Sequence, residues 1–229
     1  MPARPTDRPL APLRCCLLSG GASRRMGRDK ALLPHPEGGT WLERQLRLLA
    51  GLGAPLTLLS GWPAHLEQAA GLVAPLAGRG VELELLEELA LERLREPHPP
   101  QGPLVALGRL MEAHPGERLL LCPIDMPALT LPCLEALLEA ASDAPGAIWI
   151  ATAQRPQPLL GLYPSDAPHR QSLQGALARG ERGLQRWLAG EVVHHLALPA
   201  AALANLNTPD DLHSWRASIR SRPDCSASR

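Results

Sequence analysis

The chain has 229 residues, of which 45% are hydrophobic and 20% charged, as is typical of a folded globular domain. Its 23 basic and 23 acidic side chains cancel, which argues against binding nucleic acid or an anionic membrane through a general positive charge. Five cysteines without a CxxC pair indicate neither a disulfide framework nor a zinc site, and no run of 18 apolar residues could cross a membrane. We therefore expect a soluble, cytoplasmic protein with neither nucleic acid nor membrane as a partner.

Segments with the patterns of strands and helices alternate along the chain. Residues 1–12 are broken by proline and lack an apolar signal core, so they predict a disordered leader, and residues 218–229 predict a disordered tail. Apolar runs and alternating patterns predict strands at 13–18, 55–60, 80–86, 118–122, 147–151, 159–163 and 191–198. Helices are predicted from Thr40 to Gly51 or Gly53, at 63–70, 103–113, 130–141, 167–178 and 182–189, and from Thr208 onward. Residues 87–102 fit neither pattern clearly.

This alternation of strands and helices predicts an α/β fold. We expect a single three-layer α/β/α domain over residues 13–217, with a mainly parallel, Rossmann-like sheet. In such sheets ligands bind beyond the carboxyl ends of the strands, near the point where the strand order reverses. Gly20, Asp125 and either Glu87 or Glu88 directly follow predicted strands, so we expect them to lie along one edge of the sheet.

The most informative stretch is LLSGGASRRMGRDK, residues 17–30. Gly20 and Gly21 allow a sharp turn that exposes backbone N–H groups, and Arg25 and Lys30 follow within the same loop. Successive N–H donors beside fixed cations predict a pocket for a polyphosphate. The spacing matches neither the Gly-Lys-Ser/Thr phosphate loop nor the dinucleotide fingerprint, so a glycine turn with a solvated basic face is the alternative.

Asp125 is the strongest candidate among the acidic residues. It ends the apolar run LLLCPID and stands between Pro123 and Pro127, which makes the bend rigid. A carboxylate in this position, close to a polyphosphate loop, suits Mg²⁺, which usually takes one or two carboxylates together with phosphate oxygens. The alternative is a surface acid that stabilises a turn.

The whole loop has the form GG-x-S-x-R-M-G-x-D-K, and other characteristic strings follow it in order. These strings are GPL at 102–104, CPIDMP at 122–127, QPLLGLY at 157–163 and NLNTPDDL at 205–212. Together they resemble the MobA family, the molybdenum cofactor guanylyltransferases, which are nucleotidyltransferases. The resemblance covers about residues 13 to 216.

The resemblance implies a set of nucleotide-binding positions. They are Leu18, Ser19, Gly20, Gly21, Lys30, Ser60, Glu88, Gly102 and Asp125. The first three correspond to family positions that meet the nucleotide through backbone atoms. Ser60 and Glu88 stand where the family tends to carry Asn and Asp, and Ala106 replaces a second glycine of the usual GPLxG. These departures concern recognition of the base more than binding of the phosphates.

The resemblance also assigns catalytic and metal-binding roles. It implies that Arg25, Lys30 and Asp125 are catalytic, and that Asp125 and Asn207 hold Mg²⁺. Cations such as Lys30 would stabilise charge at the α-phosphate and on departing pyrophosphate. The local alternative for Asn207 is an Asx turn leading into the next helix, and both roles can coexist.

The reaction that the resemblance implies is transfer of GMP from GTP to the terminal phosphate of molybdopterin-bound molybdenum cofactor. Pyrophosphate would leave and a guanine dinucleotide cofactor would form. The alternatives are a cytidylyltransferase acting on the same pterin, a sugar-phosphate nucleotidyltransferase, and a non-catalytic nucleotide-binding protein. We expect GTP and the molybdenum cofactor as partners, with transient contact to cofactor-synthesis or acceptor proteins.

Overall fold

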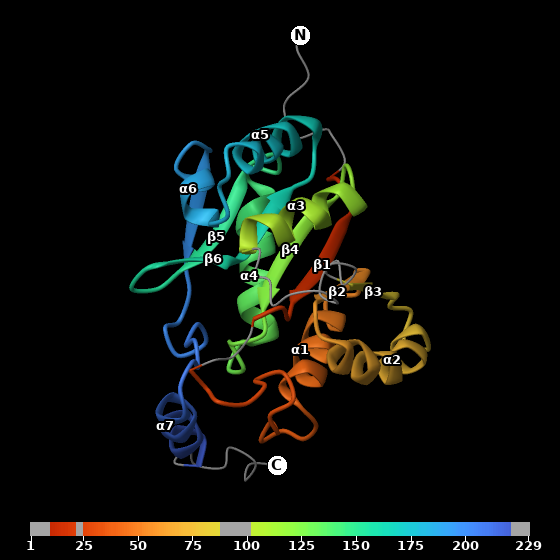
Figure 1. Cartoon of the computed structure of the whole chain (residues 1–229), viewed down its shortest axis with the longest axis vertical. Helices are drawn as coiled ribbons and strands as arrows, with labels where there is room; N and C mark the ends of the chain where they lie inside the picture. Colours follow the sequence, from red (N-terminus) through yellow and green to blue (C-terminus); the bar gives the residue numbers. More distant parts are fainter. Residues whose placement is uncertain (1–9, 22–24, 88–101, 221–229) are drawn as a thin grey trace.

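A computed structural model describes residues 10–21, 25–87 and 102–220. Seven strands are present in this part of the chain (Figure 1): β1 (Leu13–Leu18), β2 (Leu56–Ser60), β3 (Leu83–Glu87), β4 (Arg118–Pro123), β5 (Ile148–Thr152), β6 (Pro156–Pro164) and β7 (Val193–Ala197). Seven helices alternate with them: α1 (Trp41–Ala50), α2 (Pro63–Ala77), α3 (Pro103–Ala113), α4 (Leu131–Ser142), α5 (Ala167–Ala178), α6 (Leu184–Leu188) and α7 (Pro209–Arg220).

The strands form one sheet in the order β3-β2-β1-β4-β6-β5-β7. Neighbouring strands are parallel except where β6 pairs with β4 and β5, so β6 alone among the described strands runs against the others. The connections from β1 lead outward through β2 to β3, and the next strand, β4, returns to the other side of β1. The strand order therefore reverses between β1 and β4, where a ligand site is expected in a sheet of this kind.

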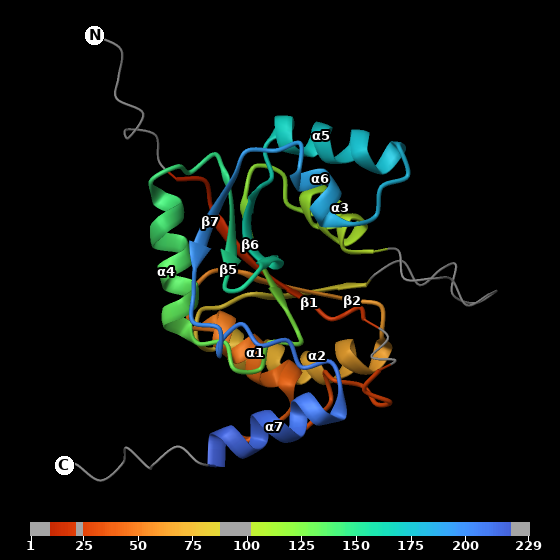
Figure 2. The same cartoon turned by 90° about the vertical axis from the view of Figure 1, so that its left-hand side faces the viewer.

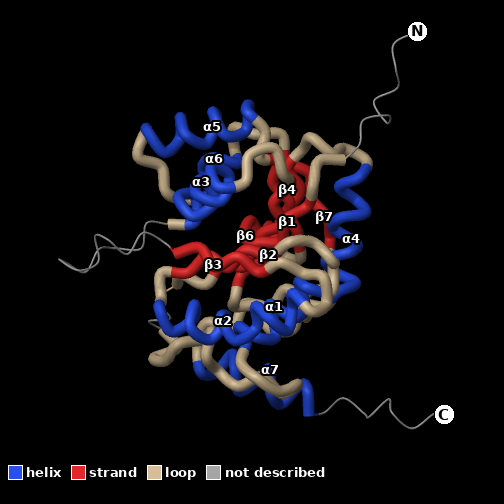
Figure 3. Tube along the Cα trace, turned by 90° about the vertical axis from the view of Figure 1, so that its right-hand side faces the viewer, coloured by secondary structure: helices blue, strands red, loops and turns tan. Residues whose placement is uncertain are grey.

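Helices cover both faces of the sheet, which confirms the predicted three-layer α/β/α fold (Figure 3). Helices α1, α2 and α4 pack on one face, and α3, α5 and α6 pack on the other. Successive side chains of a strand point to opposite faces of the sheet, so β1 contributes to the core on each face. Cys15 packs with α1, α2 and α4, and Cys16 packs with α3, α5 and α6. Helix α7 lies outside the α1 and α2 layer (Figure 2), on a third cluster that includes Met26, Trp41 and Trp215.

Local sequence signals explain several helix starts. Thr40 accepts a hydrogen bond from the Glu43 N–H, while the Glu43 carboxylate accepts one from the Thr40 N–H, so the predicted capping box is present at α1. Proline at the first turn begins α2, α3 and α5. These signals involve residues close in sequence, which is why the pattern alone predicted them.

The structure corrects the ends of three predicted helices. Helix α2 continues to Ala77 rather than ending at residue 70, because Leu72 and Leu76 are buried in the core and this packing outweighs the internal Pro75. Helix α6 spans only Leu184–Leu188, within the predicted 182–189. Helix α7 runs to Arg220, past the predicted domain end at 217.

Among the described residues, no helix is both long enough and apolar enough to span a membrane.

Candidate active site

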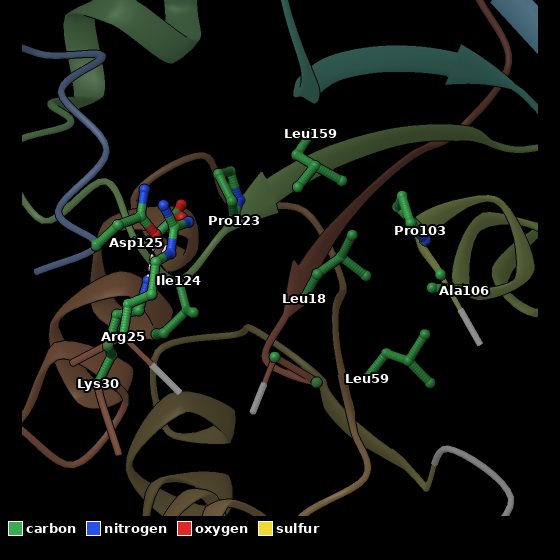
Figure 4. Close-up of a pocket in the computed structure, with 14 residues that line it drawn as sticks. Leu18, Arg25, Lys30, Leu59, Pro103, Ala106, Pro123, Ile124, Asp125 and Leu159 are labelled. Carbon is green, nitrogen blue, oxygen red and sulfur yellow. Dashed lines mark hydrogen bonds and ion pairs between the residues drawn. The ribbon is translucent and has the colours of Figure 1, made fainter. Parts of the chain in front are cut away.

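A pocket of about 380 Å³ opens at the carboxyl ends of β1, β2 and β4. It lies where the strand order reverses, between β1 and β4. Its lining residues are Leu18, Gly20, Gly21, Arg25, Lys30, Leu59, Gly102, Pro103, Ala106, Pro123, Ile124, Asp125, Leu159 and Asn207 (Figure 4). The predicted position of a ligand site at this edge of the sheet therefore coincides with a cavity large enough for a small molecule.

Charged groups gather at one end of the pocket. The Lys30 ammonium donates a hydrogen bond of 2.6 Å to Asn207 Oδ1 and lies 3.8 Å from Asp125 Oδ2. Arg25 is exposed and lies beside both Lys30 and Asp125 in Figure 4. The fold thus brings together two residues from the glycine loop, one from the end of β4 and one from the segment before α7.

Backbone contacts hold the Asn207 segment against the end of β4. The Leu206 N–H donates to the Asp125 carbonyl over 3.0 Å. The Asp211 carboxylate accepts hydrogen bonds from the N–H groups of Asn207 and Thr208, at 2.8 and 2.9 Å. Asp211 is an acidic residue in the first turn of α7, where the helix dipole and the free N–H groups favour a negative charge. The start of α7 therefore sets the position of Asn207 in the pocket.

Burial shifts the pKa values of the two charged partners. Burial raises the pKa of the Asp125 carboxyl above its ordinary value, and the opposing attraction of the Lys30 ammonium is smaller. Burial also lowers the pKa of Lys30, although Asp125 opposes this shift. Both groups are thus partly removed from water, and a charge placed between them would interact more strongly than it would in solvent.

Asp125 also has unused capacity as a metal ligand. Its Oδ1 atom is buried, and no donor among the described residues reaches it. A buried carboxylate oxygen without a partner is unfavourable by itself, and a divalent cation would satisfy it. No group of three or more His, Cys, Asp or Glu side chains suited to a metal occurs among the described residues. The residues present therefore fit a cation that shares Asp125 with phosphate oxygens or water, as Mg²⁺ commonly does.

The other end of the pocket is apolar. Leu18 and Leu59 from the ends of β1 and β2 face Pro103 and Ala106 from the first turns of α3, and Leu159 of β6 closes one side (Figure 4). A flat heterocyclic group would find apolar walls there, while an attached polyphosphate would extend toward Lys30. The pocket thus has an apolar end and a charged end, which suits a nucleotide.

The structure brings most of the sequence-predicted site residues to this pocket. Those that line it are Leu18, Gly20, Gly21, Arg25, Lys30, Gly102, Asp125 and Asn207. Ser19 and Ser60 are buried at 1% and 0% exposure, and neither lines the pocket. The Ser60 hydroxyl donates to the Ser19 carbonyl, so it faces inward. Glu88 lies outside the described residues, and the role of each position in binding stays a prediction.

Several lining residues were not among the predicted site residues. Leu59, Pro103, Ala106, Pro123, Ile124 and Leu159 all line the pocket, and all are uncharged. Apart from Leu159, which is inside β6, each lies near a strand end or in the first turns of a helix that starts at the same edge, so the predicted element boundaries contained a usable signal. Most of them stand inside the quoted strings, but apolar residues carry no chemical signature of their own, so the strings did not mark them as site residues.

Comparison with known proteins identifies the family of this chain. The family model for the MobA-like NTP transferase domain matches residues 15–198. The chain belongs to this family. As a MobA-like protein it is a nucleotidyltransferase, and Lys30 and Asp125 lie within the matched range, whereas Asn207 lies beyond it.

Relatives of this MobA-like chain include probable molybdenum cofactor guanylyltransferases. The one from Rhodopirellula baltica is 31% identical over 88% of this chain and 90% of its own length, and the one from Synechococcus elongatus is 33% identical over 88% and 95%. A crystal structure of molybdopterin-guanine dinucleotide biosynthesis protein A from Archaeoglobus fulgidus has a TM-score of 0.69 at 19% identity, covering 91% of this chain and 100% of that one. This structural likeness shows that the fold is shared.

Proposed function

We propose that this enzyme transfers GMP from GTP to the terminal phosphate of molybdopterin-bound molybdenum cofactor, with release of pyrophosphate. The observation that carries the proposal is the pocket in which Lys30, Asp125 and Asn207 meet opposite an apolar end. The choice of GTP and of the pterin acceptor is supported by relatives that are 31% and 33% identical over 88% of the chain and are probable molybdenum cofactor guanylyltransferases.

In this proposal the guanine base lies in the apolar end, between Leu59 and the first turns of α3. The triphosphate then passes the glycine turn at Gly20 and Gly21, where backbone N–H groups can donate to it. Lys30 and Arg25 face the phosphates at the charged end. The nucleotide would thus span the pocket with its α-phosphate near the groups that gather around Asp125.

The residues of the chain would act by positioning and by charge stabilisation. Lys30 would place its ammonium on oxygens whose negative charge grows as pyrophosphate departs, and Arg25 would neutralise the phosphates from the exposed side. Because Lys30 is already held by Asn207, little reorganisation is needed during the reaction. Asp125 and Asn207 would hold Mg²⁺, which would supply Lewis-acid stabilisation of the phosphate charge when bound.

The acceptor would approach from the β6 side of the pocket. Leu159 lines the pocket, and the neighbouring Gln157 accepts a hydrogen bond of 3.1 Å from the side-chain amide of Asn205. This contact joins β6 to the segment that carries Asn207. A phosphate of the acceptor bound along it could reach the α-phosphate from the side opposite the departing pyrophosphate, as in-line transfer requires.

Pyrophosphate release tests this function directly. Purified enzyme is supplied with Mg²⁺, molybdopterin-bound molybdenum and one of GTP, CTP, ATP or UTP, and with sugar phosphates as alternative acceptors. We expect release with GTP and the pterin, because relatives 31% and 33% identical to this chain are probable molybdenum cofactor guanylyltransferases. A preference for CTP would indicate a cytidylyltransferase. Transfer to a sugar phosphate would indicate a sugar-phosphate nucleotidyltransferase, and nucleotide binding without pyrophosphate release would indicate a non-catalytic protein.

Lys30 separates an enzyme from a binding protein. If its ammonium stabilises mainly the transition state, Lys30→Ala should slow single-turnover transfer roughly a hundredfold, equivalent to about 3 kcal/mol, while GTP affinity falls much less. Lys30→Arg should not restore the rate fully, because a planar fork cannot replace a compact ammonium. The exposed Arg79, changed to Ala, is the matched control for loss of a surface cation. Equal losses of rate and affinity in Lys30→Ala would contradict this role.

A further inference from the structure

A group of polar side chains, buried except for the half-buried Asp29, lies beside the glycine loop and outside the pocket. It contains Asp29 from the loop, His65 from α2, Ser19 after β1 and Ser60 at the end of β2. His65 Nε2 lies 2.7 Å from Asp29 Oδ2, and His65 Nδ1 lies 2.9 Å from both serine hydroxyls. His65 is only 1% exposed and does not line the pocket, so none of the chemistry proposed above uses it.

The proton on His65 Nε2 follows from its partner. An ionised carboxylate can only accept a hydrogen bond, so the short contact with Asp29 requires Nε2 to carry the hydrogen. On the other side of the ring, Nδ1 faces the two hydroxyls and the Ser19 carbonyl at 3.0 Å. The ring is therefore held from both sides, and it presents a fixed donor to the loop.

Asp29 connects His65 to the backbone beside Lys30. Its Oδ2 atom accepts from His65, and its Oδ1 atom accepts a hydrogen bond of 2.9 Å from the Ala31 N–H. The Leu33 N–H donates in turn to the Lys30 carbonyl over 3.1 Å. The backbone on both sides of Lys30 is thus attached to His65 through a single carboxylate. Lys30 is the residue whose ammonium contacts Asn207 and Asp125 in the pocket.

This Ser, His and Asp arrangement is not suited to nucleophilic catalysis. A nucleophilic serine must reach a substrate, but Ser19 and Ser60 are 1% and 0% exposed. The Ser60 hydroxyl also donates to the Ser19 carbonyl and accepts from the Trp62 N–H. The group is consequently a support for the loop rather than a second reactive centre.

We propose that His65 is a positioning residue that holds Lys30 in place through Asp29. The inference rests on the proposed function, because it assigns to His65 an effect on the nucleotidyl transfer in which Lys30 takes part. A charge-stabilising group acts only when it is placed correctly before the reaction, and a displacement of about 1 Å can slow a reaction roughly a hundredfold. Loss of the His65 donor therefore lowers kcat more than it weakens GTP binding.

Two conservative variants isolate the contact with Asp29. In His65→Gln the side-chain amide can still donate to Asp29, whereas in His65→Asn the shorter amide matches the Nδ1 side and cannot reach Asp29. We expect His65→Gln to keep most of kcat and His65→Asn to lose roughly tenfold to a hundredfold, with GTP affinity changed less in both. Asp29→Ala also removes the contact with the Ala31 N–H, so it should lose at least as much as His65→Asn, and the double variant should lose no more than Asp29→Ala alone. Glu67→Ala, an exposed change on the same helix, is the control.

A second measurement reads the loop itself without any substrate. Hydrogen–deuterium exchange of the peptide that contains Ala31 should be faster in His65→Asn than in His65→Gln, since only the latter keeps Asp29 in place. Equal losses of kcat in the two variants would overturn the inference. It would also be overturned if the losses of kcat correlate with the melting temperatures of the variants and not with the presence of a donor to Asp29. If wild-type enzyme transfers no nucleotide to any acceptor, the proposed function fails, and the exchange rates alone then decide whether His65 holds the loop.

Discussion

At the scale of single residues, the site combines charges that are individually unfavourable. The pKa of the Asp125 carboxyl is raised by burial and that of Lys30 is lowered by burial, so the folded chain disfavours the charged form of each. The Asp125 Oδ1 atom adds a buried oxygen that no described donor reaches. Such an arrangement is understandable if a cation and a polyphosphate complete it, because bound charges would offset the desolvation that the free protein carries.

This arrangement predicts that Asp125→Asn changes activity much more than stability. Removing the buried charge at neutral pH relieves its desolvation, but it also takes the carboxylate away from the Lys30 ammonium, so the free energy of unfolding should change by no more than about 1 kcal/mol, roughly 2–4 °C in melting temperature. Magnesium-dependent turnover should fall at least roughly a hundredfold. Asp143→Asn, at the exposed end of α4, is the control. Near wild-type turnover with unchanged magnesium dependence would remove Asp125 from the site.

At the scale of secondary-structure elements, the start of α3 is fixed by its neighbour. Gly102 has φ +90°, and a Cβ added there would lie 2.6 Å from the Arg182 carbonyl oxygen. That carbonyl accepts a hydrogen bond of 3.1 Å from the Leu104 N–H, which also explains why α6 begins only at Leu184. The loop between α5 and α6 therefore holds the first turn of α3 against the apolar end of the pocket.

Gly102→Ala should disturb both the turn and the pocket. The positive φ and the contact with the Arg182 backbone each oppose a side chain, so we expect a loss of about 1–3 kcal/mol in the free energy of unfolding. GTP affinity, measured by calorimetry, should fall with it, because Gly102 and Pro103 line the pocket. Gly146→Ala is a suitable control, since that position is exposed and a Cβ there would meet no atom within 4 Å. A Gly102→Ala protein as stable as the control would contradict this account.

At the scale of the whole molecule, a polar network joins the sheet at the end opposite to the pocket. Arg14 of β1 pairs with Glu117 over 2.8 Å, and Thr57 of β2 donates to Glu84 of β3 over 2.9 Å. His114, just after α3, lies 3.1 Å from the same Glu84 carboxylate. These contacts connect three strands with the segment that links α3 to β4.

The network predicts a loss of stability in mild acid. Burial lowers the pKa of His114, and Arg14 lowers it further, although Glu84 and Glu117 oppose the shift. Because the folded pKa lies below the ordinary value of 6.5, the unfolded chain takes up the proton first. The stability contributed by neutral His114 is therefore complete above pH 6.5 and is lost as the pH falls below it, at about 1.4 kcal/mol for each pH unit between the two pKa values.

Urea unfolding between pH 7.5 and 5 measures this effect. His114→Gln cannot take up a proton but can still donate to Glu84, so its stability should fall less steeply below pH 6.5 than that of the wild type. Part of the slope should remain, because burial also lowers the pKa of His35. Identical slopes in the two proteins would show that His114 does not couple the fold to pH.

Features that depend on neighbouring residues could be predicted from the sequence. The strand from Leu13 to Leu18, the capping box at Thr40 and Glu43, and the proline starts of several helices all follow from contacts within a few positions. The same holds for the placement of Gly20 and Asp125 at strand ends, since alternating strands and helices make the sheet parallel and bring those ends to one edge. Sequence spacing was therefore sufficient for the fold class and for the edge that carries the pocket.

Features that depend on packing between distant segments were decided only by the tertiary structure. The contact between Lys30 and Asn207 joins positions 177 residues apart, and the contact between Asp29 and His65 joins a loop to a helix that the sequence predicted too short. Ser60 shows the same limit, because a hydroxyl at a strand end can face either the pocket or the protein interior. The Ser60 hydroxyl donates to the Ser19 carbonyl and contacts His65 Nδ1, so it faces the interior. Propensity and spacing describe the chain locally, whereas side-chain orientation depends on which elements the fold packs together.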